Sequence, residues 1–476
     1  MKLIWQAEEV LRAVRGQCLH EQSWTATGVA IDSRTVKPGD LFVALKGPTH
    51  DAHDFTGQAF AAGAVAAIVQ RAPSQVPPDA PLLFVDDVFT ALQDLGRVGR
   101  QRSAATVLAV TGSVGKTGCK EQLRVMLECC GDAYANEGSF NNHWGVPLSL
   151  ARLPADAQYG VFEIGMNHAG ELGPLSREVQ PRVSLITNIE AVHLEFFASV
   201  EAIADAKAEI FLGMTPDGVA VLNRDNPHYG RLLAAARTQG LKQIVGFGRD
   251  AKADARLLDY SACDDGGKVV AEILGQKLTY RIGAAGAHVA FNSLGTLLAA
   301  TMAGADALTC AEALASYRTP SGRGTKQSVA LHDGGAFALI DESYNASPVA
   351  VRAAVRLLGE TAPATGGRRV AVLGDMRELG DAAPRLHMEL AAAIVESGID
   401  RVHCCGGMMG YLYENLPTAL RGKYAQRSAD LAPLVAAEIR NGDVVMVKGS
   451  KSTAMHLVVD ALKALQDGDS RRKIAG

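Results

Sequence analysis

The chain has 476 residues, a length typical of about three domains of roughly 150 residues each. Hydrophobic residues make up 48% and charged residues 21%, so the composition allows ordinary cores and argues against disorder. The net charge of −4, with no basic block other than Arg471–Lys473, argues against a nucleic acid as partner.

The cysteines and the first residues bear on where the protein works. The eight cysteines are scattered and contain no C-x-x-C pair, so we interpret them as reduced thiols. Met1–Trp5 runs directly into Glu8 and Glu9, which is not the pattern of a signal peptide, and no apolar run reaches the length of about 18 residues that predicts a membrane span. We therefore expect a cytoplasmic protein without a membrane span, and we expect it to be a monomer.

Residues 1–86 are predicted to form a small mixed α/β domain. Its predicted elements are a helix at 55–62 and strands at 29–31, 41–45, 66–69 and 82–85. The polar cluster Asp32-Ser33-Arg34 follows the first of these strands. It could hold a phosphate group through the Ser33 hydroxyl and the Arg34 guanidinium. The alternative is that the cluster only forms a turn.

Residues 87–317 are predicted to form a central domain around one glycine-containing turn. Thr106–Val110 is a short β-branched strand, Thr111–Thr117 is the turn, and Leu123, Met126 and Leu127 have the spacing of a helix that buries one face. A strand, a glycine turn and a helix N-terminus form a cradle for phosphate groups. The turn departs from G-x-x-x-x-G-K-[ST] because position 110, the place of the first glycine, is valine. We predict a nucleoside triphosphate site formed by Gly112, Ser113, Val114, Gly115, Lys116, Thr117 and Gly118.

The rest of the central domain is predicted to be a parallel sheet. Apolar segments typical of strands buried on both faces lie at 159–164, 183–187 and 219–222. Glu163 closes the first of these strands and Asn188 follows the second. Because ligands bind at the carboxyl ends of parallel strands, we expect both residues near the phosphate site. Residues 269–281 predict a β-hairpin with Gly275-Gln276 at its tip.

Lys207 lies on the apolar face of a predicted helix, 200–214. Burial disfavours the charged form, so a buried lysine has a lowered pKa and a nucleophilic free amine. The alternative is a lysine at the edge of the helix whose ammonium group reaches solvent. His288 and Asn292 stand four residues apart at the start of a later predicted helix, where they either share a ligand or cap the helix and pack.

From residue 318 to 476, strands again alternate with helices, which predicts a second open α/β sheet of the Rossmann-like type. The predicted strands are 336–340, 369–373, 401–404 and 444–447. Polar loops follow three of these strands, at 341–345, 374–376 and 448–450. The tendency of ligand sites to form at strand ends makes all three loops candidates for one shared site.

Several segments of the central domain resemble one superfamily, the Mur ligases and folylpolyglutamate synthetases. These are T-G-S-V-G-K-T at 111–117, Glu163-Ile164-Gly165, Thr187-Asn188 with His193-Leu194-Glu195, the segment 206–211, and Gly286-Ala287-His288 with Asn292. Four further segments resemble the branch of the family that joins D-alanyl-D-alanine to UDP-N-acetylmuramoyl-tripeptide: 140–147, 341–348, 372–380 and 447–450. The chain departs from the family pattern at Gly118, Val289 and Gly324.

The resemblance implies a small mixed α/β N-terminal domain, a central P-loop ATPase-like parallel-sheet domain and a C-terminal Rossmann-like domain. It implies an amide ligase that uses ATP and Mg²⁺ and works through an acyl phosphate. Lys116 would act on the transferring phosphoryl group, and Thr117, Glu163 and His193 would hold magnesium. Lys207 would be carbamylated and, with Lys116 and His193, would be catalytic. The implied contacts to the rest of ATP are His288, Asn292, Arg323 and Asp341.

The resemblance also distributes the substrates over the domains. The N-terminal domain would bind the uridine diphosphate end through Ser33 and Arg34, and the C-terminal domain would bind the amine substrate and part of ATP. The implied substrate contacts outside the N-terminal domain are Asn141, Asn142, Tyr344, Asn345 and Asp375. Two alternatives stay open. One is another ligase of the superfamily, adding glutamate to folate or a third amino acid to the muramoyl dipeptide; the other is a switch protein in which ATP moves domains without ligation.

Overall fold

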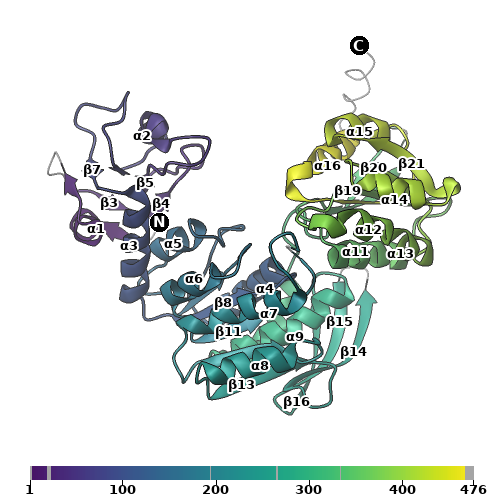
Figure 1. The fold of residues 1–476 in the computed structure, drawn as a ribbon, viewed down its shortest axis with the longest axis horizontal. Helices are drawn as coiled ribbons and strands as arrows, with labels where there is room; N and C mark the ends of the chain where they lie inside the picture. Colours follow the sequence, from purple (N-terminus) through teal and green to yellow (C-terminus); the bar gives the residue numbers. More distant parts are fainter. Residues whose placement is uncertain (1–2, 19–22, 193, 264–265, 333, 467–476) are drawn as a thin grey trace.

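The computed structural model describes residues 3–18, 23–192, 194–263, 266–332 and 334–466, and these form three successive α/β units (Figure 1). In Figure 1 the N-terminal unit (purple) and the C-terminal unit (green to yellow) lie on opposite sides of the central unit (teal). The predicted order of a small mixed unit, a phosphate-loop unit and a Rossmann-like unit is confirmed. The boundaries at 86/87 and 317/318 stay predictions.

The N-terminal sheet runs in the order β2-β7-β6-β5-β4, with β4 to β7 parallel and β2 antiparallel to β7. Its strands are β2 (Gln17–Cys18), β4 (Gly28–Ala30), β5 (Asp40–Val43), β6 (Ala66–Val69) and β7 (Leu82–Phe84). The helices of this unit are α1 (Ala7–Val14) and α2 (Thr56–Ala61). All the strands and the helix predicted here are confirmed. The sequence does not predict β2, nor the pair β1 (Trp5–Gln6) and β3 (Thr25–Ala26), because two residues cannot display an alternating pattern.

Helix α3 (Val88–Arg102) joins the N-terminal unit to the central one. It packs so closely on α5 (Gly145–Ala151) that a Cβ at Gly96 would lie 2.8 Å from the Pro147 carbonyl oxygen, and one at Gly99 would lie 2.3 Å from that of Leu150. Glycine at both positions therefore allows the two helix backbones to approach. The Trp5 indole donates to the Ala151 carbonyl at 2.8 Å, which anchors the first strand to the same helix pair.

The central sheet runs in the order β16-β15-β14-β13-β12-β11-β8-β10-β9. The strands are β8 (Thr106–Thr111), β9 (Ala133–Ala135), β10 (Tyr159–Glu163), β11 (Val183–Ile186), β12 (Val219–Asn223), β13 (Gln243–Gly248), β14 (Ala255–Cys263), β15 (Gly266–Ile273) and β16 (Gln276–Ile282). Pairing is parallel from β9 to β14, as predicted. The pairs β14/β15 and β15/β16 are antiparallel, so the parallel sheet ends in an antiparallel extension. The hairpin predicted at 269–281 is confirmed as β15 and β16.

Helices cover both faces of the central sheet (Figure 1). They are α4 (Lys116–Glu128), α6 (Leu172–Val179), α7 (Val200–Ala208), α8 (Tyr229–Thr238), α9 (Ala287–Met302) and α10 (Ala307–Ala313). Along β8, Leu108 and Val110 face the core beneath α4 and α9, whereas Val107 and Ala109 face the core beneath α6 and α7. This two-sided burial is why parallel strands are apolar along their whole length. The helix predicted at 200–214 ends earlier, because residues Glu209–Gly213 form a 3₁₀ helix.

The C-terminal sheet runs in the order β17-β18-β22-β19-β20-β21, with β17 antiparallel to β18 and the other pairs parallel. Its strands are β17 (Thr325–Ala330), β18 (Ala336–Glu342), β19 (Arg369–Gly374), β20 (Arg401–Cys405), β21 (Arg421–Ala425) and β22 (Val444–Lys448). Its helices are α11 (Pro348–Glu360), α12 (Ala383–Met388), α13 (Leu390–Glu396), α14 (Met409–Asn415), α15 (Ser428–Ala436) and α16 (His456–Lys463). The predicted strands are confirmed. The polar edge strands β17 and β21 are missed because they lack an apolar run.

We predict that His403 makes the stability of the protein depend on pH. The side chain is 1% exposed in β20, its Nδ1 accepts the Lys423 N–H at 2.9 Å, and burial lowers its pKa from 6.5 to about 4. Above pH 6.5 the imidazole is neutral in both states. As the pH falls from 6.5 to 4, only the unfolded chain binds a proton, so the free energy of unfolding should fall by up to about 3 kcal/mol.

Urea unfolding of the wild type and of His403→Gln, followed between pH 7.5 and pH 4, measures this dependence. Glutamine keeps a hydrogen-bond acceptor but does not titrate, so its unfolding free energy should fall less steeply over this range. Equal slopes for the two proteins would contradict the assignment.

Candidate active site

The phosphate loop forms between β8 and α4, as the sequence predicts, and two of its glycines are required by their surroundings. Gly112 has φ +144°, and a Cβ there would lie 2.0 Å from Thr187 Oγ1. Gly115 has φ +86° immediately before α4, and a Cβ there would lie 2.8 Å from Asn292 Nδ2. The loop is therefore pressed between the end of β11 and the first turns of α9, and only glycine fits at these two positions.

Hydrogen bonds between the phosphate loop and the segment that follows β11 hold the loop in shape. The Thr187 hydroxyl donates to the Val114 carbonyl at 2.6 Å, and the Ser113 hydroxyl donates to the Glu190 carbonyl at 3.1 Å. Lys116 donates from Nζ to the Gly112 carbonyl at 2.8 Å. Burial lowers the pKa of Lys116, and the nearby Glu163 carboxylate opposes that shift. The loop thus presents one lysine and the N-terminus of α4 to an anion.

Glu163 and Thr117, which the sequence predicts as magnesium ligands, are in direct contact. The Thr117 hydroxyl donates to Glu163 Oε2 at 2.7 Å, and Asn141 Nδ2 donates to Glu163 Oε1 at 2.6 Å. The Glu163 side chain is 1% exposed. A hydroxyl and a carboxylate next to a phosphate cradle are the oxygen donors that Mg²⁺ prefers, so the residues present fit this cation. His193, the third predicted ligand, lies outside the described residues.

The described part of the chain holds no cluster of three or more histidine, cysteine, aspartate and glutamate side chains suited to a metal. A magnesium site beside the phosphate loop would therefore take its protein ligands from only a few of the described side chains. Mg²⁺ commonly takes only one or two carboxylates and completes its shell with substrate phosphates and waters. The pair Thr117–Glu163 matches that pattern better than a closed protein cage.

Lys207 is fully buried on α7, and within the described residues its Nζ has no hydrogen-bond partner. Burial lowers its pKa well below the usual range, and the charge of Lys116 lowers it further. The alternative of an ammonium group that reaches solvent is therefore wrong. Lys207 lies close enough to Lys116 and Glu163 for their charges to act on its pKa, which Lys116 lowers and Glu163 raises.

A cavity of about 1080 Å³ joins the phosphate loop and Glu163 to the C-terminal domain. The predicted site residues that line it are Ser113, Val114, Gly115, Lys116, Thr117, Gly118, Asn141, Glu163, His288, Asn292, Arg323, Tyr344 and Asn345. Arg323 stacks on the Tyr344 ring, with its Cζ 4.1 Å from the ring centroid, and the Tyr344 hydroxyl donates to Ser139 Oγ of the central domain. The two domains thus build one site, and the phosphate loop lies in it.

Five described site residues predicted in the central and C-terminal domains do not line this cavity: Gly112, Asn142, Lys207, Asp341 and Asp375. Gly112 belongs to the phosphate loop but packs against Thr187, and Asn142 Oδ1 accepts the backbone N–H groups of residues 144 and 145 at the start of α5. Asp341 accepts the N–H and the hydroxyl of residue 343. Asp375 is buried, and its Oδ1 accepts the Met409 N–H at 2.8 Å. Asn142 and Asp375 therefore have local structural partners, and Asp375 ties the end of β19 to α14.

The N-terminal pair is separate from the cavity. Ser33 and Arg34 follow β4, and the Arg34 guanidinium pairs with the Asp32 carboxylate at 2.6 Å. This ion pair holds the pKa of Asp32 below its usual range. The Arg34 side chain is 84% exposed, so it is available to a ligand.

The cavity also contains residues that the sequence did not single out as site residues. Lys448, 3% exposed at the end of β22, donates to Glu342 Oε2 at 3.0 Å and to the Asn345 carbonyl at 3.0 Å. Arg377 lines the cavity too, and its N–H donates to Ser450 Oγ at 3.0 Å. The expectation that the loops after β18, β19 and β22 meet is therefore confirmed. Their position at strand ends was the signal that could have identified Lys448 and Arg377.

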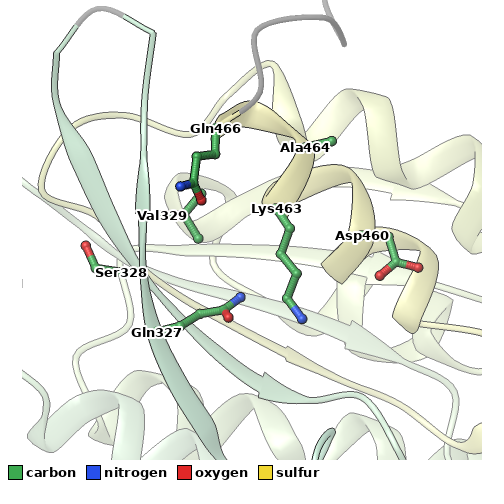
Figure 2. A pocket seen from close by; sticks show the side chains of 7 residues that line it. All are labelled: Gln327, Ser328, Val329, Asp460, Lys463, Ala464 and Gln466. Atoms are coloured by element: carbon green, nitrogen blue, oxygen red, sulfur yellow. The ribbon is translucent and has the colours of Figure 1, made fainter.

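A second cavity of 360 Å³ lies between β17 and α16, away from the predicted site (Figure 2). Figure 2 shows the side chains of Gln327 and Lys463 extending toward one another across it. None of the residues that line it is a predicted site residue, and we assign it no role. Among the described residues, no helix has both the length and the apolar character needed to cross a membrane.

Comparison with known proteins places the chain in a family. Residues 25–91 match the Mur ligase family catalytic domain, 110–300 the Mur ligase middle domain, and 329–451 the Mur ligase glutamate ligase domain. The UDP-N-acetylmuramoyl-tripeptide–D-alanyl-D-alanine ligase of Escherichia coli is 34% identical, over 92% of this chain and 94% of that protein. The enzyme of the same name from Rickettsia prowazekii is 33% identical, over 91% of this chain and 94% of that protein.

Solved structures agree with the sequence comparison. MurF from Acinetobacter baumannii superposes with a TM-score of 0.82 at 29% identity, over 97% of this chain and 99% of that one. MurF from Thermotoga maritima, in complex with ADP, superposes with a TM-score of 0.75 at 25% identity, over 92% of this chain and 98% of that one. With relatives above 30% identity across nine-tenths of its length, the chain belongs to the Mur ligase family.

Proposed function

We propose that this protein is an ATP-dependent amide ligase that joins D-alanyl-D-alanine to UDP-N-acetylmuramoyl-tripeptide, in the cytoplasmic synthesis of peptidoglycan precursors. The observation that carries the proposal is the arrangement around the phosphate loop: Thr117 contacts Glu163, and the fully buried Lys207, whose pKa is lowered by burial, is close enough for the charge of Glu163 to act on it. The relatives named for this reaction cover almost the whole chain, which supports the choice of substrates. We expect the protein to act as a monomer.

The chemistry explains why these groups are needed. A carboxylate is a poor electrophile, because an amine would have to displace oxide. Transfer of the γ-phosphoryl group from ATP to the carboxylate gives an acyl phosphate, from which phosphate leaves when the amine attacks. Lys116 and the N–H groups of the loop hold the negative charge of the phosphoryl group during transfer. Thr117, Glu163 and His193 would hold Mg²⁺, which supplies positive charge against the phosphate oxygens.

Lys207 would supply an anion to this site after carbamylation. Its neutral amine attacks the carbon of CO₂, a C–N bond forms, and loss of a proton leaves a carbamate in place of the amine. The reaction needs the neutral form of the amine, and the burial of Lys207, which lowers its pKa, favours that form. A carbamate provides oxygen donors that orient the cation site, which an unmodified lysine cannot do.

The substrates would enter from the two outer domains. His288, Asn292, Arg323 and Asp341 would hold the adenine, ribose and phosphates of ATP. Ser33 and Arg34 would bind the uridine diphosphate end of the sugar peptide. The loops with Tyr344-Asn345 and Asp375 would present the amine, and Asn141 and Asn142 would contact the substrate. His288, Asn292, Arg323, Asn141, Tyr344 and Asn345 are supported by lining the same cavity as the phosphate loop.

Phosphate release with a panel of amines tests the proposal. We expect release only when ATP, UDP-N-acetylmuramoyl-tripeptide and D-alanyl-D-alanine are all present, with a product heavier by one dipeptide less one water. Release with glutamate and a folate, or with a free amino acid and the muramoyl dipeptide, would instead identify another ligase of the superfamily. Release that never depends on an amine would favour an ATP-driven switch and would contradict ligase activity.

A further inference from the structure

A lysine without an assigned function lies one turn along α4 from Thr117. Lys120 is fully buried, and its Nζ donates to the Asn136 carbonyl at 2.6 Å and to the Gly138 carbonyl at 3.3 Å. The same ammonium group pairs with Glu121 Oε1 at 2.7 Å. A buried ammonium group is unfavourable unless it is paired and hydrogen-bonded, and Lys120 is both. Besides this ion pair on its own helix, Lys120 contacts one segment, residues 136–141, which we call the 136–141 loop.

Both ends of the 136–141 loop contact the end of β10. Asn136 is 1% exposed, and its Oδ1 accepts the Glu163 N–H at 2.8 Å while its Nδ2 donates to the Phe140 carbonyl at 3.0 Å. At the other end, Asn141 Nδ2 donates to Glu163 Oε1, and the Asn141 carbonyl accepts the Gly165 N–H at 2.8 Å. The loop therefore holds both the backbone and the carboxylate of Glu163.

Two glycines leave room for the loop in this position. A Cβ at Gly165 would lie 3.0 Å from Asn141 Cγ, a closer approach than most real Cβ contacts. A Cβ at Gly145 would lie 2.4 Å from the Phe140 backbone. The loop is thus confined between β10 and the start of α5, and a shift of Asn141 would move its amide away from Glu163.

We propose that Lys120 and Asn136 are positioning residues for the reaction, which hold the 136–141 loop so that Asn141 fixes the Glu163 carboxylate against Thr117. Neither residue is among those that line the cavity, so both act through Asn141 and Glu163. This inference rests on the proposed function only in one respect, namely which reaction is used to measure kcat. Outer groups that orient a metal ligand commonly change metal affinity or activity by roughly 10- to 100-fold when they are removed.

The test compares Lys120→Met and Asn136→Leu with Tyr280→Phe. The control removes a buried hydrogen bond of 2.7 Å, between Tyr280 and Ser293 in the same domain, which does not involve the loop. For the two loop variants we expect kcat to fall by roughly 10- to 100-fold with the KM for ATP unchanged. We expect the dissociation constant for Mn²⁺, measured by electron paramagnetic resonance with a non-hydrolysable ATP analogue, to rise by a similar factor. Amide hydrogens of residues 138–141 should exchange faster. Tyr280→Phe should change none of these.

Lys120→Arg keeps the donors and should recover part of the Mn²⁺ affinity. Gly165→Ala displaces Asn141 from the opposite side and should give the same signature, so the test stays decisive even where Lys120→Met does not fold. Wild-type kcat and Mn²⁺ affinity in folded Lys120→Met and Asn136→Leu, or equal losses in Tyr280→Phe, would overturn the inference. A wild type that makes no amide from the proposed substrates would overturn the proposed function instead. Mn²⁺ binding and hydrogen exchange do not depend on that reaction, so they would still test the role of the 136–141 loop.

Discussion

Replacing Lys207 by alanine is expected to lower kcat by roughly 10²- to 10³-fold, the loss typical of removing a preorganised charged group from a transition state. In the proposed mechanism Lys207 acts only as a carbamate, so a substitution removes the anion that orients the cation site. Alanine leaves space at the position of the fully buried side chain. Short-chain carboxylates such as formate and acetate should therefore restore part of the activity. Phosphate release, with and without these anions, measures the effect.

The same position should show the opposite effect on stability. Lys207 has no hydrogen-bond partner for Nζ among the described residues, and burial lowers its pKa in the folded protein well below the pKa of an exposed lysine. In CO₂-depleted buffer, Lys207→Met should raise the free energy of unfolding by roughly 1–3 kcal/mol, the penalty of a buried polar group without a partner. Because the pKa of Lys207 is lower in the folded state, the gain should grow as the pH falls from 10.5 toward that lowered pKa.

Lys242→Met provides a control, since Lys242 is exposed on the same domain. We expect it to change neither activity nor stability. Full activity of Lys207→Ala, with no response to added carboxylates, would contradict the carbamate. A loss of stability in Lys207→Met would show that the amine has a favourable contact in the folded state.

Glu163→Gln is expected to reduce kcat by roughly 10²- to 10³-fold while leaving the fold intact. Glutamine has the shape of glutamate, and its carbonyl oxygen can still accept the hydrogen bond from Asn141. What it loses is the negative charge beside Thr117, which the mechanism requires for the cation. The KM for ATP should change less than kcat, because Lys116 and the loop N–H groups still bind the phosphates.

Glu128→Gln is the matched control for this charge. Glu128 lies at the other end of α4 and pairs with Arg124 at 2.8 Å on the surface, so neutralising it should leave kcat unchanged. Steady-state phosphate release at increasing Mg²⁺ concentrations distinguishes the two variants. Glu163→Gln with wild-type kcat and wild-type dependence on Mg²⁺ would rule out Glu163 as a metal ligand.

The elements that the sequence predicts correctly are those with a strong local signal. The strands β8, β10 and β12 are apolar along their length because both faces of the sheet are covered, and this leaves an unbroken run in the sequence. The phosphate loop is equally local, because its glycines, lysine and threonine are consecutive. Two of the strands that sequence analysis misses, the edge strand β17 and the outer half of β14, have mostly exposed or polar side chains. Their pairing, and not their composition, makes them strands.

For the candidate site, too, the sequence identifies individual residues, whereas their contacts are visible only in the structure. Residue types and spacing identified Thr117, Glu163 and Lys207 as candidates, but only the structure brings Thr117 to 2.7 Å from Glu163 across 46 residues of sequence. The structure also gives Asp375 a partner in Met409, away from the cavity. Spacing alone could not separate these outcomes, because each depends on which loops meet at the edge of a sheet.

By itself, the sequence of this protein determined the order of its three α/β units, the phosphate loop and the family it resembles, since these depend on neighbouring residues. Only the tertiary structure decided that Lys207 is buried without a partner, that Lys120 supports the loop around Glu163, and that Lys448 and Arg377 line the cavity. The physical reason is that burial, pKa and hydrogen bonding depend on side chains distant in sequence, which the chain brings together only when the sheets and helices have packed.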